Sequence, residues 1–199
     1  MHPSSKFAWT DQAAMHAFVT ETGLAQIVTI KEGKPASAQA PLVIAPDGSI
    51  RFHLSRANRL TALLDGAPVL ASVIGTNFYV SPDWYGTPDQ VPTWNYRIVE
   101  IEGLARLLDE AELRDQIDRL SAVHEALLAP KPAWTSAKMD ARKRDMLVRA
   151  IVGFAIEEPR FSGALKMGQN KSDAEAAGAI AALRAIGKAD AADAMEAAR

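Results

Sequence analysis

The stretch from Tyr79 to Tyr96 constrains the fold most, because it combines large aromatic rings with residues that interrupt regular structure. It holds all three tyrosines and two of the four tryptophans, together with Pro82, Pro88 and Pro92. Each proline lacks a backbone N–H and fixes its own φ, which excludes a helix and a central strand. The stretch is therefore predicted to be a loop. Amphipathic rings in a loop need a flat apolar partner.

Three partners could cover these rings: the protein's own core, a second subunit, or a planar ligand held between rings and polar tips. Because aromatic clusters are more often structural, the pattern alone favours packing or a subunit interface over a ligand. On a monomer, an exposed loop carrying Trp84, Tyr85 and Trp94 would promote aggregation. We therefore expect a two-fold homodimer that buries the loop.

The composition bounds the class of protein. With 199 residues, 48% apolar and 23% charged, the chain can bury one substantial core, so we expect one domain with appendages. A net charge of −2 and a pI near 6.1 give no global positive field for nucleic acid or an anionic membrane. The absence of cysteine excludes disulfides and thiolate chemistry. No apolar run approaches the roughly 20 residues that span a bilayer, and a cytoplasmic protein is expected.

The rest of the chain is predicted to be a strand meander with peripheral helices. Short turns between β-branched runs favour antiparallel pairing. Two capping signatures, Asp109 with Glu112 and Ser172 with Glu175, mark helix starts. About seven strands, enough for a barrel, indicate an α+β fold. Strands are expected at 25–30, 35–44, 49–54, 69–74, 93–108 (with a bulge or bend at Gly103), 151–157 and 160–166 (separated at Pro159), and helices at 11–23, 59–65, 109–128, 138–150 and beyond 172.

Two polar segments are candidates for ligand binding. The segment 53–59 runs from a strand into a predicted helix, with a hydroxyl and two guanidiniums beside the helix N-terminus, an arrangement that favours phosphate. A plain cap with solvated arginines is an equally good interpretation. The segment 166–171 carries two lysines and two amides ahead of the Ser172 helix, where a solvated helix entry is the commoner interpretation. No metal-ligand set, P-loop, Gly-x-Gly-x-x-Gly or Gly-x-Ser-x-Gly is present, and no catalytic acid or base is defined.

Five segments of the chain form a series of motifs: His53-Leu54-Ser55-Arg56-Ala57-Asn58, Tyr79-Val80-Ser81-Pro82-x-Trp84-Tyr85, Val91-Pro92-Thr93-Trp94-Asn95-Tyr96, Ile151-Val152-Gly153-Phe154 and Lys166-Met167-x-Gln169-Asn170-Lys171. Together with the helix that carries Leu120, His124 and Glu125, these segments resemble, in order and spacing and over essentially the whole chain, the motifs of the PaiB-like family. That family is described as FMN-binding negative transcriptional regulators.

The resemblance implies an antiparallel split β-barrel that binds FMN, similar to the pyridoxamine-phosphate oxidase and flavin reductase folds. It also implies a homodimer with flavin at the subunit interface, so that the aromatic stretch would be an interface element and a flavin wall together. The split-barrel domain would span 1–171, including helices 109–128 and 138–150, with 172–199 as a helical extension of the same domain. The implied cofactor-binding residues are Gln39, His53, Ser55, Arg56, Asn58, Tyr79, Ser81, Trp84, Tyr85, Trp94, Asn95, Lys166, Gln169 and Asn170.

Within this set, the loop from Ser55 to Arg59 is expected to receive the FMN phosphate, with Arg56 as the main charge partner and backbone donors of an Asn58-capped helix completing the shell. Two departures from the family pattern predict weaker flavin binding. Gln39 stands where the family usually has histidine, and Gly168 where it usually has serine. The fold inference does not depend on either position.

Two functions follow from the resemblance. The first is a flavin-binding regulator or sensor. The alternative is an FMN-dependent oxidoreductase or flavin reductase acting on a small molecule with NAD(P)H, because one fold hosts many functions and the cofactor carries the redox chemistry. The chain offers neither an appended helix-turn-helix nor a basic face, which argues against direct DNA binding of the usual kind.

Overall fold

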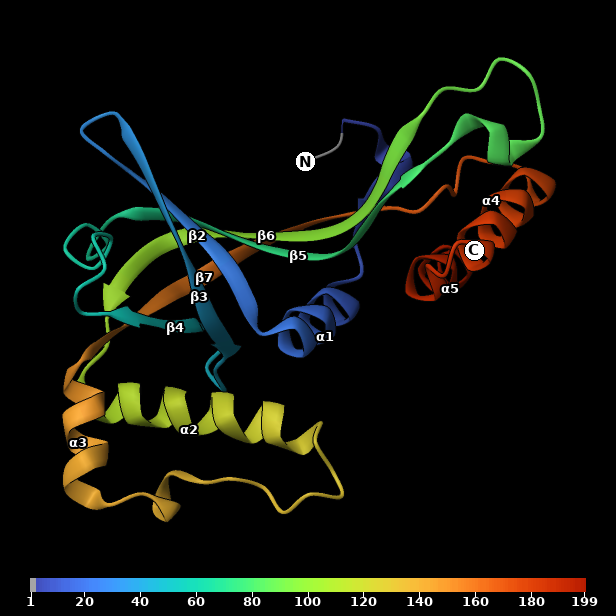
Figure 1. Cartoon of the computed structure of the whole chain (residues 1–199). Coiled ribbons are helices and arrows are strands. Elements are labelled where there is room, and N and C mark those ends of the chain that lie inside the picture. The colour runs from blue at the N-terminus through green and yellow to red at the C-terminus, as the bar shows by residue number, and fades with distance from the viewer. Residues whose placement is uncertain (1–2) are drawn as a thin grey trace. The chain divides into compact units, whose positions relative to one another are not determined.

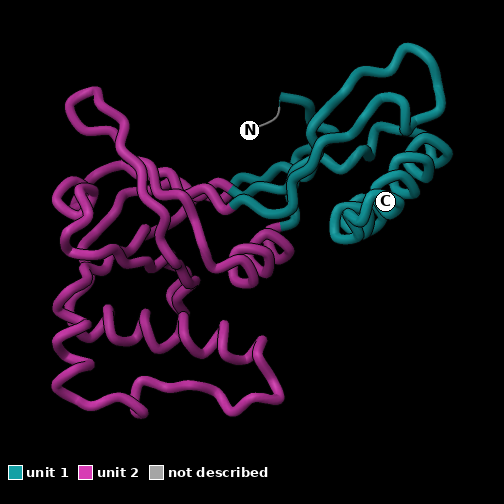
Figure 2. Tube along the Cα trace, in the orientation of Figure 1, with its two compact units in different colours: residues 1–11, 74–99, 162–199 teal, residues 12–73, 100–161 magenta. Residues whose placement is uncertain are grey.

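The computed structural model describes residues 3–199, which form two compact units (Figures 1 and 2). Unit 1 contains the chain up to Asp11, Ile74–Val99 and Ser162–Arg199. Unit 2 contains Gln12–Val73 and Glu100–Phe161. Three long strands pass from one unit to the other, so each unit is assembled from segments far apart in the sequence.

The described strands form one seven-stranded sheet in the order β1-β7-β4-β3-β2-β5-β6, and β6 also pairs with β7. The second pairing closes the strands from β2 to β7 into a ring, to which β1 adds at β7. This is the antiparallel split barrel predicted from the sequence. The bounds are β1 Ala8–Trp9, β2 Leu24–Lys31, β3 Lys34–Ile44, β4 Ile50–Ser55, β5 Pro68–Val80, β6 Thr93–Leu107 and β7 Ile151–Lys166.

Unit 2 holds the barrel core. β4 and β7 pair in register with Phe52 opposite Phe154, and these two rings stack at a centroid distance of 5.5 Å. Gly103 of β6 lies where the side chain of Ile156 of β7 crosses it; a Cβ there would be 2.4 Å from the Ile156 Cγ2. The glycine therefore allows close packing of β6 and β7.

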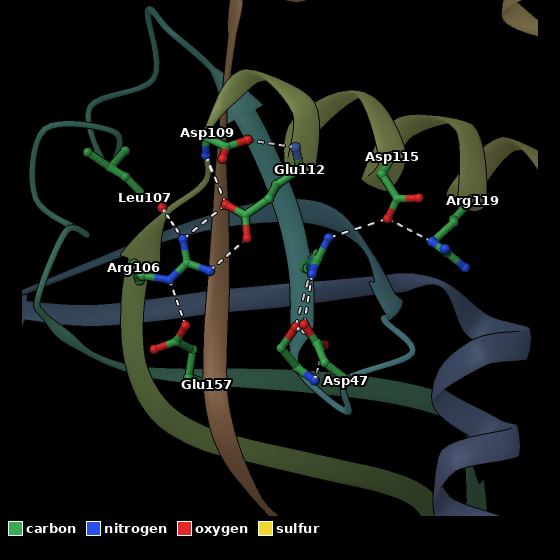
Figure 3. A network of polar contacts seen from close by, with 10 residues as sticks. Asp47, Arg106, Leu107, Asp109, Glu112, Asp115, Arg119 and Glu157 are labelled. Carbon is green, nitrogen blue, oxygen red and sulfur yellow. Dashed lines mark hydrogen bonds and ion pairs between the residues drawn. The ribbon is translucent and has the colours of Figure 1, made fainter.

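Helix α2 (Glu110–Ala126) is attached to the barrel through its first turn. The Asp109 side chain accepts a hydrogen bond from the Glu112 N–H at 2.8 Å, and Glu112 accepts one from the Asp109 N–H at 3.0 Å, which confirms the predicted capping box. Arg106 of β6 donates to both Glu112 carboxylate oxygens, at 2.9 and 3.0 Å, and to Glu157 of β7 at 2.7 Å (Figure 3). The Arg106 hydrogen bonds, together with the bond from Asp109, lower the pKa of Glu112 to about 2.

Unit 1 packs two C-terminal helices against the end of the β5–β6 hairpin. Helix α4 (Asp173–Ala185) begins at Ser172, whose predicted capping box with Glu175 is confirmed, and α5 (Ala189–Ala197) follows. Their buried cluster includes Phe78, Tyr85 and Met195. The remaining helices of the described chain are the 3-10 helices η1 Ser5–Phe7, η2 Pro82–Tyr85 and η3 Ser136–Lys138, and, in unit 2, α1 Gln12–Thr22 and α3 Ala141–Arg149.

The stretch from Tyr79 to Tyr96 is not one loop, contrary to the sequence prediction. β5 continues to Val80, the 3-10 helix η2 follows, and β6 starts at Thr93. Pro82 occupies the first position of η2, where no N–H is needed, so proline begins this element instead of breaking it.

The predicted helix at 59–65 is wrong. Its N–H groups bond three residues back, from Thr61 to Asn58 and from Leu63 to Leu60, which makes consecutive turns. So short a segment gains few i→i+4 bonds to offset helix nucleation. Tertiary packing dominates instead, because Leu60 and Leu64 are both fully buried.

β7 is one strand, and the predicted separation at Pro159 is wrong. Pairing with β4 ends at Ile156 and pairing with β1 starts at Gly163, so the proline falls between the two ladders and removes no hydrogen bond from either.

α3 is shorter than predicted because Asp140 caps it. α2 ends at Ala126 instead of residue 128. The two-residue strand β1 was not predicted.

Gly178 of α4 tests how closely unit 1 is packed. Glycine in a helix interior normally costs about 1 kcal/mol relative to alanine, so Gly178→Ala would ordinarily stabilise. Here the added Cβ would lie 2.3 Å from the Trp84 carbonyl oxygen. We expect Gly178→Ala to lower the free energy of unfolding by about 1–3 kcal/mol in chemical denaturation, the range for overpacking. Ala174→Gly on the exposed face of α4 should show the ordinary propensity cost, and a more stable Gly178→Ala would contradict the packing argument.

Candidate functional site

The residues predicted to bind flavin fall into two groups, one in each unit. Unit 2 carries the barrel group, and unit 1 carries the hairpin group together with the segment that follows β7. Each group is described on its own. The barrel group is Gln39, His53, Ser55, Arg56 and Asn58; the hairpin group is Tyr79, Ser81, Trp84, Tyr85, Trp94, Asn95, Lys166, Gln169 and Asn170.

His53 of β4 is bonded to α2. Its Nδ1 lies 3.0 Å from the Oε1 of Gln116, a fully buried residue whose Nε2 has no hydrogen-bond partner. The tautomer that satisfies this geometry has Nδ1–H donating to Oε1. Burial lowers the pKa of His53, and the Gln116 bond opposes that shift. His53 is therefore held neutral and links β4 to α2.

The backbone of the loop after β4 does not form the expected phosphate cradle. The N–H of Arg56 donates to the Ala150 carbonyl at 2.8 Å, and the N–H of Ala57 to Ser55 Oγ at 3.3 Å. The N–H of Asn58 donates to the Ser55 carbonyl, and Asn58 Oδ1 accepts from Leu60. These donors are occupied, and no helix follows them. The predicted backbone shell from an Asn58-capped helix is therefore wrong.

Guanidinium groups remain available in this loop. Arg56 donates from Nε to the Arg149 carbonyl at 2.9 Å and from Nη2 to the Ile151 carbonyl at 3.2 Å, so it also binds the chain at the C-terminus of α3. A guanidinium has five N–H donors, and three of those on Arg56 are still free. Arg59 is exposed, with no side-chain partner in the described chain. Side chains, without backbone donors, therefore fit a phosphate here.

Gln39 lies on β3, exposed, opposite Gln26 of β2. Its neighbour Ala40 is fully buried, which agrees with the predicted alternation of faces. The amide of Gln39 is therefore accessible to a ligand.

The β5–β6 hairpin has one uncovered face in unit 1. Tyr79 and Trp94 are 43% and 57% exposed, and their rings meet edge to face with centroids 6.2 Å apart. The interplanar angle is 71°, so the two amphipathic rings form an angled apolar patch with polar tips at the sheet surface. Such a patch fits either an isoalloxazine ring or a second subunit.

The other aromatic residues of the set lie on the covered side. Tyr85 is 4% exposed within the helical core, and its hydroxyl has no partner. Burial raises the pKa of Tyr85. Trp84 packs against the same core, and Asn95 is 1% exposed with its Nδ2 unpartnered. The predicted aromatic residues therefore do not form one wall.

The segment after β7 is held by its own side chains. Gln169 closes a turn, because its Oε1 accepts from the Met167 N–H at 2.8 Å and its Nε2 donates to the Leu165 carbonyl at 2.7 Å. Lys166 donates to the Thr93 hydroxyl, and burial lowers the pKa of its ammonium. Ser81 makes no side-chain cap to η2, and Asn170 is exposed.

The structure explains why glycine stands at position 168, where the family usually has serine. Its φ is +83°, a conformation that favours glycine, and a Cβ there would lie 3.2 Å from the Met195 Cε. α5 therefore packs where a serine side chain would stand.

Sequence reasoning missed two residues that bond to members of these groups. Gln116 lies within the predicted helix 109–128, next to the apolar Ile117, and a polar residue beside the apolar side of a helix is the signal that was available. Thr93 holds Lys166 and has no signal, because only the tertiary structure brings the two together.

Comparison with known proteins defines the class. The fold resembles the FAD and heme binding protein from Mycobacterium smegmatis, with a TM-score of 0.61, 18% identity, and coverage of 85% of this chain and 78% of that one. It also resembles the flavocytochrome Anf3 from Azotobacter vinelandii, with a TM-score of 0.58, 20% identity, and coverage of 89% and 78%. These likenesses show a shared fold.

Residues 1–158 match the family described as "Putative FMN-binding domain", and the chain belongs to that family. It is also 26% identical over 179 residues to the protease synthase and sporulation protein PAI 2 of Bacillus subtilis (strain 168), covering 88% of this chain and 85% of that protein. FMN or a related flavin is the cofactor that this membership supports.

Within residues 3–199, no helix is long and apolar enough to cross a membrane, and no group of three or more acidic or histidine side chains could hold a metal ion.

His53 should make stability depend on pH. Because its pKa is lower in the folded chain than the ordinary value of 6.5, the unfolded chain binds the proton more readily. The stabilisation is fully present above that value and is lost as the pH falls below it towards the folded pKa. His53→Asn, which keeps a donor close to the Nδ1 position, should flatten the dependence of urea-unfolding free energy on pH.

Gln116→Leu provides the complementary test. It removes the bond that opposes the shift, so the dependence on pH should become steeper than in the parent protein. If His53→Asn and the parent protein have the same slope, His53 does not control this titration.

Proposed function

We propose that this protein is a flavin-binding regulator or sensor of the PaiB type that works as a homodimer. The observation that carries the proposal is the family match over residues 1–158, together with the exposed Tyr79–Trp94 ring pair in the same chain. A flavin needs cations for its phosphate and polar partners for the edge of its ring system, and unit 2 offers Arg56, Arg59 and Gln39 for these tasks.

In this proposal the residues of unit 2 bind the flavin. Arg56 and Arg59 bind the phosphate through their guanidinium groups, while Gln39 offers an amide to the polar edge of the ring system. Tyr79 and Trp94 of unit 1 form, separately, a surface that a partner subunit covers. Bound flavin would supply redox chemistry, and the chain's own residues bind it, orient it and exclude water.

Regulation, in this proposal, comes from flavin occupancy and not from DNA contacts made by this chain. The net charge is −2, and ion pairs neutralise several arginines, such as Arg106 with Glu112, so these guanidiniums are not free for nucleic-acid phosphates. A partner macromolecule in the cytoplasm would then recognise the flavin-bound form of the protein. The related protein of Bacillus subtilis is named protease synthase and sporulation protein PAI 2, and a link to sporulation is compatible with a regulatory role.

The function is tested by purifying the protein without added flavin, recording its absorbance and titrating FMN. Saturable FMN binding without bleaching by NAD(P)H supports the regulator. Bleaching by NAD(P)H supports the flavin oxidoreductase instead. Absence of any flavin binding overturns both, and retardation of a promoter fragment in a gel would overturn the indirect mode of regulation.

The phosphate position is tested by comparing FMN with riboflavin, which lacks the phosphate. We expect Arg56→Ala and Arg59→Ala each to weaken FMN binding by about 1.5–3 kcal/mol, the range for a hydrogen bond to a charged group. Riboflavin should bind both variants almost as it binds the parent. Arg142→Ala, on an exposed face of α3, is the matched control. Equal losses for both ligands would place the phosphate elsewhere, with Lys166 and Lys171 as the next candidates.

The dimer is tested on the uncovered hairpin face. A double substitution of Tyr79 and Trp94 to serine should shift the mass found by light scattering from dimer towards monomer, because it removes the apolar area that a partner would bury. Ile186→Ser is the control, since Ile186 is 56% exposed in the same unit but lies away from the hairpin strands. A parent protein that is already monomeric at micromolar concentration contradicts the proposal.

A further inference from the structure

A cavity lies in unit 2 between α2, α3 and the segment that joins them. Its volume is about 590 Å³, within the range of small-molecule sites. The wall is mainly apolar and includes Trp134, Met139 and Val148. None of the predicted flavin residues lines it except Ser55, which is exposed.

The joining segment is fixed in place. The backbone N–H of Trp134 donates to Glu125 Oε2 at 2.8 Å, and the Lys131 ammonium donates to the same oxygen. The Lys131 bond and the Trp134 bond lower the pKa of Glu125. The wall that carries Trp134 is therefore anchored to α2, so the cavity is largely formed before any ligand binds.

Arg144 of α3 lines this cavity with an unsatisfied charge. Its Nε is buried with no hydrogen-bond partner, and no carboxylate of the described chain pairs with its guanidinium. The adjacent Asp145 is already bonded to Arg114 at 2.8 Å, and Arg114 also pairs with Glu110. Arg144 as a residue is only partly buried, so a ligand would meet its terminal N–H groups, and a cation without a counter-ion favours an anionic group supplied from outside the chain.

The other polar residues of the lining are compatible with an organic anion. Arg114 is neutralised by its two carboxylates, and Ser136 supplies a hydroxyl. Asp118 lines the cavity too, but it is exposed, so solvent screens its charge. The cavity therefore combines a mainly apolar, tryptophan-containing wall with one arginine that lacks a counter-ion.

We propose that this cavity binds a small aromatic carboxylate, whose ring packs against Trp134 and the aliphatic side chains and whose carboxylate accepts from Arg144. This ligand is separate from the flavin and goes beyond the proposed function. The site is built mainly by α2, α3 and the segment between them, with Ser55 and Ile151 at its edge, so a ligand can occupy it with or without flavin.

The test uses 1-naphthoate and its neutral analogue 1-naphthamide as probes in isothermal titration calorimetry on the full chain. The parent protein should bind 1-naphthoate saturably and more tightly than 1-naphthamide. Arg144→Met should weaken 1-naphthoate binding about ten-fold or more, the lower end of the range for a charged hydrogen bond, and leave 1-naphthamide nearly unchanged. Arg142→Met, on the same helix but outside the cavity lining, should change neither.

Two further measurements separate this site from the flavin site. Ser136→Trp should fill the cavity and abolish binding of both probes, with FMN binding and the circular dichroism spectrum unchanged. Saturating FMN should leave 1-naphthoate affinity unaltered. The proposal is overturned if 1-naphthoate does not bind the parent protein at millimolar concentration, if Arg144→Met and Arg142→Met behave alike, or if FMN displaces the probe.

Discussion

The pairing of β6 with β7 is the constraint on which the rest of the structure depends. Without it the strand order would be an open sheet with an exposed edge, and the barrel core around Phe52 and Phe154 would lose a wall. The pairing requires Gly103 at the crossing with Ile156. The same two strands hold Arg106 and Glu157, which pair with each other, and Arg106 also pairs with Glu112 in the first turn of α2. Closure of the barrel therefore also positions the helix that bonds His53.

β4 and the loop after it show how one segment serves both stability and binding. His53 bonds to α2 and Arg56 to the carbonyls at the end of α3, so the loop links the two helices to the barrel. These bonds use backbone and side-chain donors that would otherwise be free for a phosphate. What remains for a ligand is the outer part of Arg56 and the whole guanidinium of Arg59. Anion binding by such a loop relies on long side chains, which can adapt to a ligand more easily than a fixed backbone cradle.

In unit 1 one face of the β5–β6 hairpin is buried and the other is exposed, because successive side chains of a strand point to opposite sides. Phe78 packs in the cluster that α4 and α5 cover and Asn95 is buried, while their neighbours Tyr79 and Trp94 remain exposed. The C-terminal helices thus decide which aromatic residues are core and which are surface. They also explain Gly168, since Met195 of α5 packs where a side chain would stand.

The sequence by itself determined the strands of the meander and the two capping boxes, since these depend on local turn chemistry and on residues a few positions apart. The split barrel was predicted through the resemblance of several motifs to a known family, because its closure joins β6 to β7, which lie far apart in the chain. It also located the aromatic stretch and the Arg56 loop. Only the tertiary structure decided that Tyr85 and Asn95 are buried, that 59–65 forms turns around Leu60 and Leu64, and that β7 continues past Pro159. Each of these depends on a partner distant in the chain, so the free energy of packing and pairing, which no local pattern contains, overrode the local preference.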